Sequence, residues 1–475
     1  MRMNPDQLYE RVLASDASYN GRFFFGVTTT GIYCLPSCSA RKPKPENIRF
    51  FPTAKAARAA GLRACKKCHP DDFARGADPV LESIEQLVTE IRTTPSAFKD
   101  ARAVVRRSGF GPTRLFELFR QHYHATPAEV LLRARLDTTK RALLTSDAAL
   151  ADIAFAAGFE SLSVFHEHFR MRNGLTPAAY RDLRTARSFE ITLPPDYPLA
   201  YLKRTLSRDP HSLTERLDGD LYTTVVRLGE NQTPARITLH FNANVVTARV
   251  DASASAGAHA LIVALLGLDQ DAASFARLAR KLGFARLVAN RTELRLTQTS
   301  SVFDGLLWAI IGQQINLPFA FQLKHRLTAL ASRPFSDGLY APPAPDDIAR
   351  LEPEQLKPLQ FSRSKANYVI DTARLIAGGQ LDLEALRTAS ATRAERTLLA
   401  IRGLGPWSVN YLMMRALGFA DCVPLGDTGV TSGLQTLFKL DERPDIEATK
   451  RLMSIFSPYR SLATAHLWQL NQPVP

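Results

Sequence analysis

The sequence predicts a multidomain, mainly α-helical protein that also contains a small cysteine-rich α+β domain and a sheet domain. The chain has 475 residues, which is too long for one hydrophobic core. Apolar residues recur at spacings of three and four in 79–93, as expected for an amphipathic helix. Residues 188–194 and 235–250 instead alternate apolar and polar residues, which indicates a half-buried antiparallel sheet.

Composition favours a globular protein with a polyanionic partner. Hydrophobic residues make up 45% of the chain, and the formal net charge is +14. Charge alone does not choose between nucleic acid, a membrane surface and no such partner. The first residues carry no apolar signal region, and the apolar run at 261–268 is too short to span a bilayer. We therefore expect a cytoplasmic protein that does not associate with membranes.

Four of the five cysteines form two close pairs, Cys34 with Cys38 and Cys65 with Cys68. In a reducing compartment such pairs are metal ligands or catalytic thiols more often than disulfides. Two short-spaced pairs supply the four tetrahedral ligands that Zn²⁺ prefers. We expect one Zn²⁺ on these four thiolates, with His69 as a substitute ligand and disulfides as the alternative.

Residues 31–71, from "GIYCLPSC" through "NIRFF" to "CKKCHPD", resemble the N-terminal zinc domain of the Ada adaptive-response proteins. The resemblance implies a four-cysteine zinc site whose first cysteine, Cys34, accepts a methyl group from an Sp methylphosphotriester in DNA. A thiolate is the nucleophile that this reaction needs, and zinc keeps a cysteine deprotonated at neutral pH. A purely structural zinc site has the same spacing and stays open.

Two helix-turn-helix units are expected within residues 80–184. The first turns at Gly109 and the second at Gly158, and Ser161 is placed to cap the helix that follows. The residues expected to face inward are Phe116, Phe119, Ile153, Ala157, Val164, Phe165 and Phe169.

This stretch, most of all "DIAFAAGFESLSVFHEHFRMRNGLTPAAYR", resembles the DNA-binding domain of AraC-type activators. The resemblance implies helices in adjacent major grooves with outward side chains at base edges. The alternative for each candidate is an exposed side chain that contacts only solvent. The many arginines of the first helix-turn-helix unit disfavour a protein-binding helical bundle. The candidate DNA contacts are Thr113, Arg114, Glu117, Ser161, Leu162, Ser163, His166 and Arg170.

The C-terminal part is helical again and contains a glycine hairpin. A helix over 303–311 breaks at "GQQI", and residues 397–430 read as helix, Gly403-Leu404-Gly405 hairpin, a helix opened by Pro406, and a loop with Asp427. Such a hairpin leaves backbone amides free to hold a phosphate. Taken alone, the hairpin also reads as an ordinary turn, and Asp427 as a helix N-cap.

"RGLGPWSVNYLMMRALGFADCVPLGDTGV" with "SPYRSLATAHLWQ" resembles the AlkA-type 3-methyladenine DNA glycosylases of the helix-hairpin-helix superfamily. The resemblance implies base flipping and cleavage of the N-glycosidic bond, with Asp427 as catalytic aspartate. Trp308, Trp407 and Tyr411 are pocket candidates, with a core role as the alternative. Trp407 stands where bifunctional relatives carry lysine, which implies a monofunctional enzyme. Gln314 matches the position of a DNA-inserted wedge, although AlkA itself has leucine there.

The prediction is thus a fusion of four parts. They are an Ada-like zinc domain (1–77), an all-α double helix-turn-helix domain (80–184), an α+β sheet domain (188–299) and an all-α helix-hairpin-helix glycosylase domain (300–475). We expect a monomer at the nucleoid whose partners are damaged DNA, promoter DNA and RNA polymerase, and which releases 3-methyladenine- or 7-methylguanine-type bases. Cys422 lies outside any nucleophile motif and is expected to be a buried thiol. The alternatives are a regulator whose glycosylase half only binds DNA, and a zinc-stabilised DNA-binding protein without methyl transfer.

Overall fold

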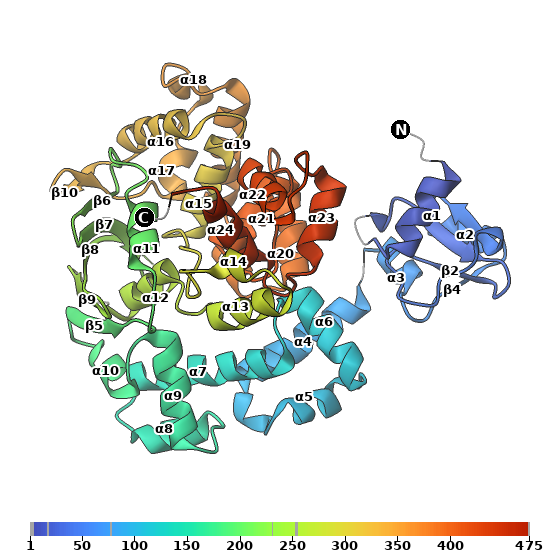
Figure 1. Cartoon of the computed structure of the whole chain (residues 1–475), viewed down its shortest axis with the longest axis horizontal. Helices are drawn as coiled ribbons and strands as arrows, with labels where there is room; N and C mark the ends of the chain where they lie inside the picture. The colour runs from blue at the N-terminus through green and yellow to red at the C-terminus, as the bar shows by residue number, and fades with distance from the viewer. Residues whose placement is uncertain (1–3, 17–18, 77, 230, 252–254, 474–475) are drawn as a thin grey trace. The chain divides into compact units, whose positions relative to one another are not determined.

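The computed structural model describes residues 4–16, 19–76, 78–229, 231–251 and 255–473. The chain divides into two units, Met1–Val88 and Thr89–Pro475, and the division falls inside helix α4 (Pro79–Thr93) (Figure 1). This helix has the bounds that its apolar spacing predicts. Within the described residues no helix is long and apolar enough to cross a membrane.

The first unit is built on a four-stranded sheet with the order β3-β1-β2-β4. Strand β1 pairs antiparallel with β2 and β3, while β2 and β4 run parallel. Phe23 and Phe25 are buried in the same cluster as Cys34, Cys38 and Cys65, so the cysteines lie at the edge of an apolar core. The elements are α1 (Pro5–Leu13), β1 (Phe24–Val27), β2 (Ile32–Cys34), η2 (Pro45–Asn47), β3 (Ile48–Phe51), α2 (Ala54–Ala59), β4 (Arg63–Ala64) and α3 (Pro70–Ala74).

Two helix-turn-helix units open the second unit, as predicted. Gly158 ends α8 at φ +93°, and a Cβ there would lie 2.8 Å from the Ser96 backbone, so the turn needs glycine. Ser161 caps α9 by accepting the amide of Val164. The helices are η3 (Pro95–Ala97), α5 (Ala101–Ser108), α6 (Pro112–Tyr123), α7 (Pro127–Thr145), α8 (Leu150–Ala156), α9 (Leu162–Asn173) and α10 (Pro177–Asp182).

Two of the expected inward residues are exposed instead. Phe119, Phe165 and Phe169 are fully buried, but Phe116 is 39% exposed and Val164 is 45% exposed. The buried residues of α6 lie at 115, 118, 119, 122 and 123, and position 116 lies at the edge of the face that they form. Val164 precedes the buried Phe165 and is displaced from the inner face in the same way.

The predicted sheet is present and has five antiparallel strands in the order β5-β9-β8-β7-β6. The expected alternation is confirmed in β8, where Ile237, Leu239 and Phe241 are buried and His240 is exposed. Strands β6 and β7 were not predicted. The elements are β5 (Ser188–Thr192), α11 (Leu199–Leu206), β6 (Glu215–Asp218), β7 (Leu221–Leu228), β8 (Thr233–Phe241), β9 (Val245–Val250) and α12 (Ser255–Leu266).

One continuous core joins the second helix-turn-helix unit to this sheet. Phe165 and Phe169 belong to the same buried cluster as Ile191, Leu239 and Ile262, and Figure 1 shows α10 beside β5. His259 of α12 hydrogen-bonds through Nε2 to the Asn173 carbonyl at 2.8 Å inside this core. The sheet and the helix-turn-helix unit therefore stabilise each other.

The rest of the chain forms two helical clusters. The first gathers α15, α16, α19, α20 and α21 around Leu306, Val369 and Leu412, and the second packs α13 and α14 against α22, α23 and α24. The helix predicted over 303–311 is α15, and it ends before "GQQI". The elements are α13 (Ala272–Lys281), α14 (Ala285–Val288), α15 (Val302–Ile311), α16 (Leu317–Ala331), β10 (Pro334–Ser336), β11 (Leu339–Tyr340), α17 (Pro345–Ala349), α18 (Pro353–Leu356), α19 (Arg363–Ala377), η4 (Glu384–Arg387), α20 (Ala391–Leu399), α21 (Pro406–Arg415), α22 (Thr428–Phe438), α23 (Ile446–Ser454) and α24 (Arg460–Leu470).

Candidate active site, DNA-binding elements and zinc site

Asp427 caps α22 and also accepts hydrogen bonds from two tryptophans. Its Oδ1 accepts the Val430 amide at 3.0 Å and the Trp468 indole N–H at 2.8 Å, and its Oδ2 accepts the Trp407 indole N–H at 3.3 Å. The capping alternative is therefore correct as a structural role, but it leaves the carboxylate half-buried among aromatic rings rather than in open solvent. Trp468 was not predicted as a site residue, although "HLWQ" was part of the motif.

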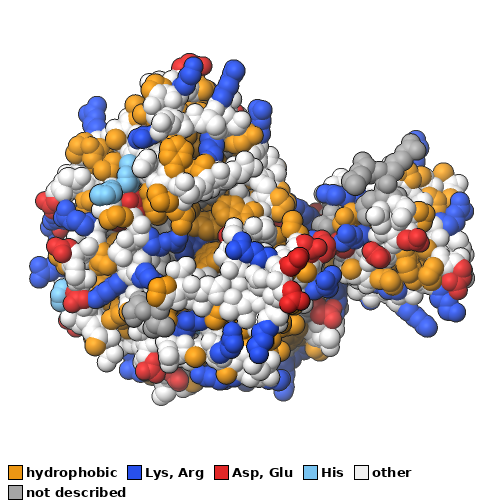
Figure 2. Space-filling view, turned by 45° about the horizontal axis from the view of Figure 1, so that its top comes forward, with side chains coloured by type: hydrophobic (Ala, Val, Ile, Leu, Met, Phe, Trp, Pro, Cys, Tyr) orange, Lys and Arg blue, Asp and Glu red, His pale blue; other side chains and the backbone are white. Residues whose placement is uncertain are grey.

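Aromatic rings lead from this carboxylate to a cavity. Trp407 stacks on Tyr411 one turn later in α21, with ring centroids 5.2 Å apart, and Trp468 lies 6.4 Å from Tyr411. The cavity, of about 160 Å³, lies between the sheet and helices α15, α16 and α21. Trp308 and Tyr411 line it, whereas Trp407 lies beside the carboxylate. Figure 2 shows hydrophobic and basic side chains around a hollow of the second unit.

The glycine hairpin between α20 and α21 is held from two sides. Gly403 has φ +93°, and a Cβ there would overlap the ring of Tyr368. The side-chain amide of Gln313 donates to the Gly403 carbonyl at 2.9 Å and to Ser408 Oγ at 3.1 Å. Gly405 is the N-cap of α21 and supplies no side-chain acceptor, so first-turn amides of α21 stay available to an anion.

Two further candidates lie near the hairpin. Leu404 is buried, so only the backbone of this residue is suited to contact DNA. Gln314 is exposed in the loop between α15 and α16 at φ +55°, a left-handed conformation that is uncommon outside glycine, asparagine and aspartate. Its neighbour Gln313 points to the hairpin instead.

The side chains of the candidate DNA-contacting residues in the helix-turn-helix units are accessible to solvent. Thr113 and Glu117 are exposed on α6, and Arg114 forms an ion pair with Glu117 at 3.2 Å. On the second recognition helix, the exposed residues are Leu162, Ser163, His166 and Arg170, with Ser161 as N-cap. Capping uses the Ser161 hydroxyl as acceptor for a backbone amide and leaves its O–H free to donate.

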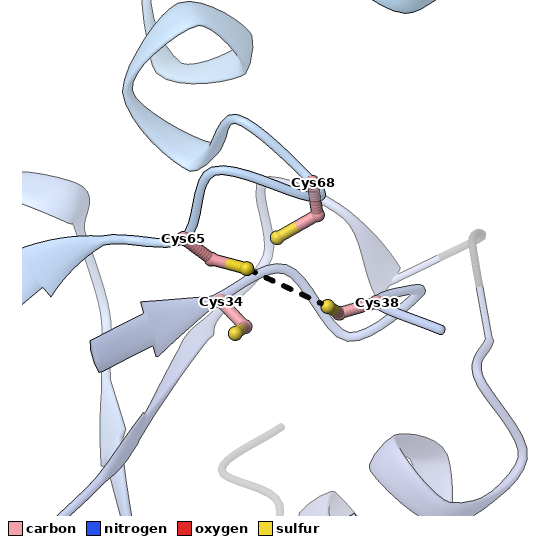
Figure 3. A group of neighbouring side chains, drawn as sticks. All are labelled: Cys34, Cys38, Cys65 and Cys68. Carbon is pink, nitrogen blue, oxygen red and sulfur yellow. Dashed lines mark hydrogen bonds between the residues drawn. The ribbon is translucent and has the colours of Figure 1, made fainter. Parts of the chain in front are cut away.

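The four clustered cysteines come together at one point of the first unit (Figure 3). Their sulfurs lie within 4.8 Å of one another, and the Cys38 and Cys65 sulfurs are 3.9 Å apart. Sulfurs around one Zn²⁺ at 2.3 Å would be about 3.8 Å apart, so the donor set fits one tetrahedral zinc ion. Hydrogen bonds with the Cys38 and Cys68 sulfurs, together with burial, raise the pKa of Cys34.

The surroundings of the cysteine cluster are polar on one side. The amides of Leu35 and Lys67 approach the Cys68 and Cys65 sulfurs at 3.4 Å each, as donors to thiolates. His69 does not join the cluster, because its Nδ1 faces Asp72 at 3.3 Å. The fifth cysteine, Cys422, is buried as expected, and burial raises the pKa of its thiol.

A zinc-binding module, a double helix-turn-helix and a sheet with a helix-hairpin-helix bundle define a multidomain DNA-acting protein with a DNA glycosylase fold. Three family models match the chain: the metal binding domain of Ada over residues 7–71, a helix-turn-helix domain over 104–183, and the HhH-GPD superfamily base excision DNA repair protein over 307–458. The chain belongs to the family of bifunctional transcriptional activator/DNA repair enzymes.

Individual relatives agree with this membership. The "Probable bifunctional transcriptional activator/DNA repair enzyme AlkA" of Mycobacterium tuberculosis is 28% identical over 99% of this chain and 97% of its own. The "Bifunctional transcriptional activator/DNA repair enzyme AdaA" of Bacillus subtilis is 30% identical over 38% of this chain and 84% of its own. Among solved structures, the 3-methyladenine DNA-glycosylase from Archaeoglobus fulgidus shares the fold, with a TM-score of 0.52, 20% identity, and coverage of 59% of this chain and 97% of that one.

Proposed function

We propose that the second unit is a monofunctional DNA glycosylase that excises alkylated purines of the 3-methyladenine and 7-methylguanine type. One observation carries this proposal: the Asp427 carboxylate accepts indole N–H groups from Trp407 and Trp468 and stands at the end of an aromatic path to a cavity. These two hydrogen bonds fix the orientation of the carboxylate, so water molecules are not needed to hold it in place.

The chemistry follows from the charge that develops on the sugar. As the N-glycosidic bond breaks, its electron pair leaves with the base and C1′ gains oxocarbenium character. The Asp427 carboxylate faces this positive charge and orients the water whose oxygen bonds to C1′. The proton that this water loses passes to the carboxylate and from there to solvent. Alkylation at N3 or N7 makes the purine cationic and a good leaving group, so no strong acid is required.

The aromatic residues select the leaving base. A cationic purine is attracted to the faces of tyrosine and tryptophan, which Tyr411 and Trp308 offer. Trp407 carries no amine, so no Schiff base forms at its position and the abasic site stays intact. Gln314, exposed next to the hairpin, is the proposed wedge in the gap left by the extruded nucleotide.

We further propose that the first unit accepts a methyl group on Cys34. Zinc, when bound, keeps the cysteine sulfurs deprotonated at neutral pH. The Cys34 sulfur attacks the methyl carbon of a DNA methylphosphotriester, so that an S–C bond forms and the C–O bond breaks. The electron pair stays on the phosphate, which becomes an ordinary anionic diester. Loss of one thiolate charge then reduces repulsion between this unit and DNA.

The helix-turn-helix residues complete the proposal as promoter contacts. Thr113, Arg114 and Glu117 of α6, and the exposed residues of α9 that follow Ser161, would read bases in adjacent major grooves. We propose recruitment of RNA polymerase, a monomeric state, nucleoid association, and domain limits near residues 77, 184 and 299 on the same basis.

Base release tests the enzymatic half. Duplex DNA containing 3-methyladenine or 7-methylguanine is incubated with the whole protein, and free base is measured. Release that Asp427→Asn abolishes supports the glycosylase, whereas tight binding without release supports a regulator whose glycosylase half only binds DNA. Labelled methyl from methylated DNA should appear on Cys34, and its failure to transfer supports a structural zinc.

A further inference from the structure

The cavity behind Tyr411 contains two arginines for which the structure provides no acidic partner. Arg208 follows α11, Arg415 ends α21, and both line the cavity. Over the described residues, neither side chain has an ion pair or a hydrogen bond to a protein group. Arg208 is exposed in its loop, whereas the Arg415 Nε is buried without an acceptor. A buried guanidinium nitrogen is normally paired, so Arg415, with Arg208 on the same cavity, marks a place for an acceptor.

The other charged residues of the cavity are already matched. Lys324 contacts Asp304 at 2.9 Å, and His325 contacts Asp209 at 2.7 Å. Glu215 accepts a hydrogen bond from the hydroxyl of Tyr222, and burial raises the pKa of this glutamate. The cavity therefore keeps an excess of hydrogen-bond donors on the side of the two arginines.

The arginines lie at the far end of the path that starts at Asp427. Arg415 is one helical turn after Tyr411, and Arg208 lines the same cavity as both. Tyr411 stacks on Trp407, which donates to Asp427. A deoxyribose at Asp427 would thus direct its base along Tyr411 toward the two guanidinium groups.

The size of the cavity limits what enters it. Its volume of about 160 Å³ is smaller than the roughly 300–1,000 Å³ of pockets for drug-sized ligands, which suits one base and not a whole nucleotide. Purines differ at C6, where guanine and hypoxanthine carry an acceptor oxygen and adenine carries a donor amino group. A guanidinium donates to the oxygen and repels the amino hydrogens.

We propose that Arg208 and Arg415 recognise the C6 oxygen of an extruded purine, so that the cavity prefers 6-oxopurines over 6-aminopurines. This specificity rests on the proposed glycosylase function. Both residues act on the base and not on the sugar, so their removal changes the choice of substrate more than the chemistry at C1′.

A matched pair of lesions isolates this choice. 7-Methylguanine and 7-methyladenine are both cationic and methylated at the same atom, and duplexes carrying hypoxanthine add a 6-oxopurine without methyl, positive charge or 2-amino group. Rates are divided by the spontaneous release of each base. We expect the wild-type protein to favour 7-methylguanine over 7-methyladenine by about tenfold or more, the discrimination typical of one arginine–base contact. Hypoxanthine release should depend on the same arginines.

The variants Arg208→Met and Arg415→Met should reduce that ratio toward one and leave 7-methyladenine release unchanged or faster. Arg350→Met, at an exposed position of the same unit, is the control. If Arg415→Met fails to fold, Arg208→Met alone tests the proposal. Retained release of 7-methyladenine shows that a variant is folded.

Two results would overturn the assignment. The first is equal rates of 7-methylguanine and 7-methyladenine release by the wild-type protein. The second is an equal fall in the release rate of every base in both variants, because it indicates that the arginines hold a DNA phosphate. No release of any base by the wild type would instead contradict the glycosylase proposal itself.

Discussion

The indole N–H of Trp468 donates a 2.8 Å hydrogen bond to Oδ1 of Asp427. Helix α24 thereby holds the carboxylate that lies at the N-terminus of α22. Gly429 makes this contact possible, because a Cβ at that position would lie 2.7 Å from the Trp468 ring. Gly429, two residues after Asp427, and Trp468 form one arrangement, and its purpose in our proposal is to orient an anion.

Replacing Trp468 by phenylalanine keeps an aromatic ring but removes the donor. A hydrogen bond to a charged group contributes about 1.5–3 kcal/mol, so single-turnover release of 3-methyladenine should slow by about 10- to 100-fold. Trp407→Phe should slow it less, because the bond from that indole is longer, at 3.3 Å. Binding of undamaged duplex should stay unchanged in both variants, and a parallel loss of binding would argue against a role in orientation.

The hairpin glycine Gly403 should be required for DNA binding. Gly403→Ala adds a Cβ that overlaps the Tyr368 ring, so the hairpin must shift. Gly379→Ala is the matched control, because Gly379 has φ +70° and open space around it. Both variants should lose about 1 kcal/mol of stability from the left-handed backbone. Only Gly403→Ala should weaken duplex binding, by about tenfold, in a fluorescence anisotropy titration.

Zinc removal should abolish the activity of the first unit and leave the activity of the second unit unchanged. The three tryptophans, Trp308, Trp407 and Trp468, all belong to the second unit. A chelator should therefore abolish methyl transfer to Cys34 while tryptophan fluorescence and base release stay unchanged. Cys38→Ser should have the same effect without the chelator. A fall in base release on chelation would show that the glycosylase half depends on the metal.

Stability of the second unit should decrease below neutral pH because of His259. Burial lowers the pKa of His259 from 6.5 to about 4, so the unfolded chain binds a proton there more readily than the folded chain. The loss begins as the pH falls below 6.5 and is complete near pH 4. At pH 5 it amounts to about 2 kcal/mol.

The measurement is urea unfolding at pH 7 and pH 5, followed by tryptophan fluorescence. His259→Gln should reduce the difference between the two pH values, since glutamine can still donate to the Asn173 carbonyl. His240→Gln, at an exposed strand position, is the control for loss of an imidazole. An unchanged pH dependence in His259→Gln would contradict the assignment of this group.

Local patterns in the sequence predicted much of the fold. The helix over 79–93, the helix-turn-helix turns at Gly109 and Gly158, and the alternation in β8 each depend on neighbouring residues, and the structure confirms them. Phe116 and Val164 were assigned to the wrong face, because a helix with several apolar residues in succession does not reveal which one faces inward. Strands β6 and β7 were missed because their apolar alternation is weaker.

The site was predicted only where its residues belong to one motif. Asp427 and Trp407 are 20 residues apart in a single segment, and the structure joins them by a hydrogen bond. Trp468 and Arg208 reach the site only through the packing of α24 and of the loop after α11. Trp468 lies in a second motif segment 41 residues after Asp427 and Arg208 lies in no motif, so their contacts with the site needed the three-dimensional fold.

The central claim is that Asp427 stabilises positive charge on the sugar as the base leaves. Single-turnover release of 3-methyladenine from duplex DNA by Asp427→Asn tests it most directly, because asparagine keeps the shape and can still cap α22. We predict a loss of about 100-fold or more with unchanged affinity for the duplex. Release at the wild-type rate would contradict the account.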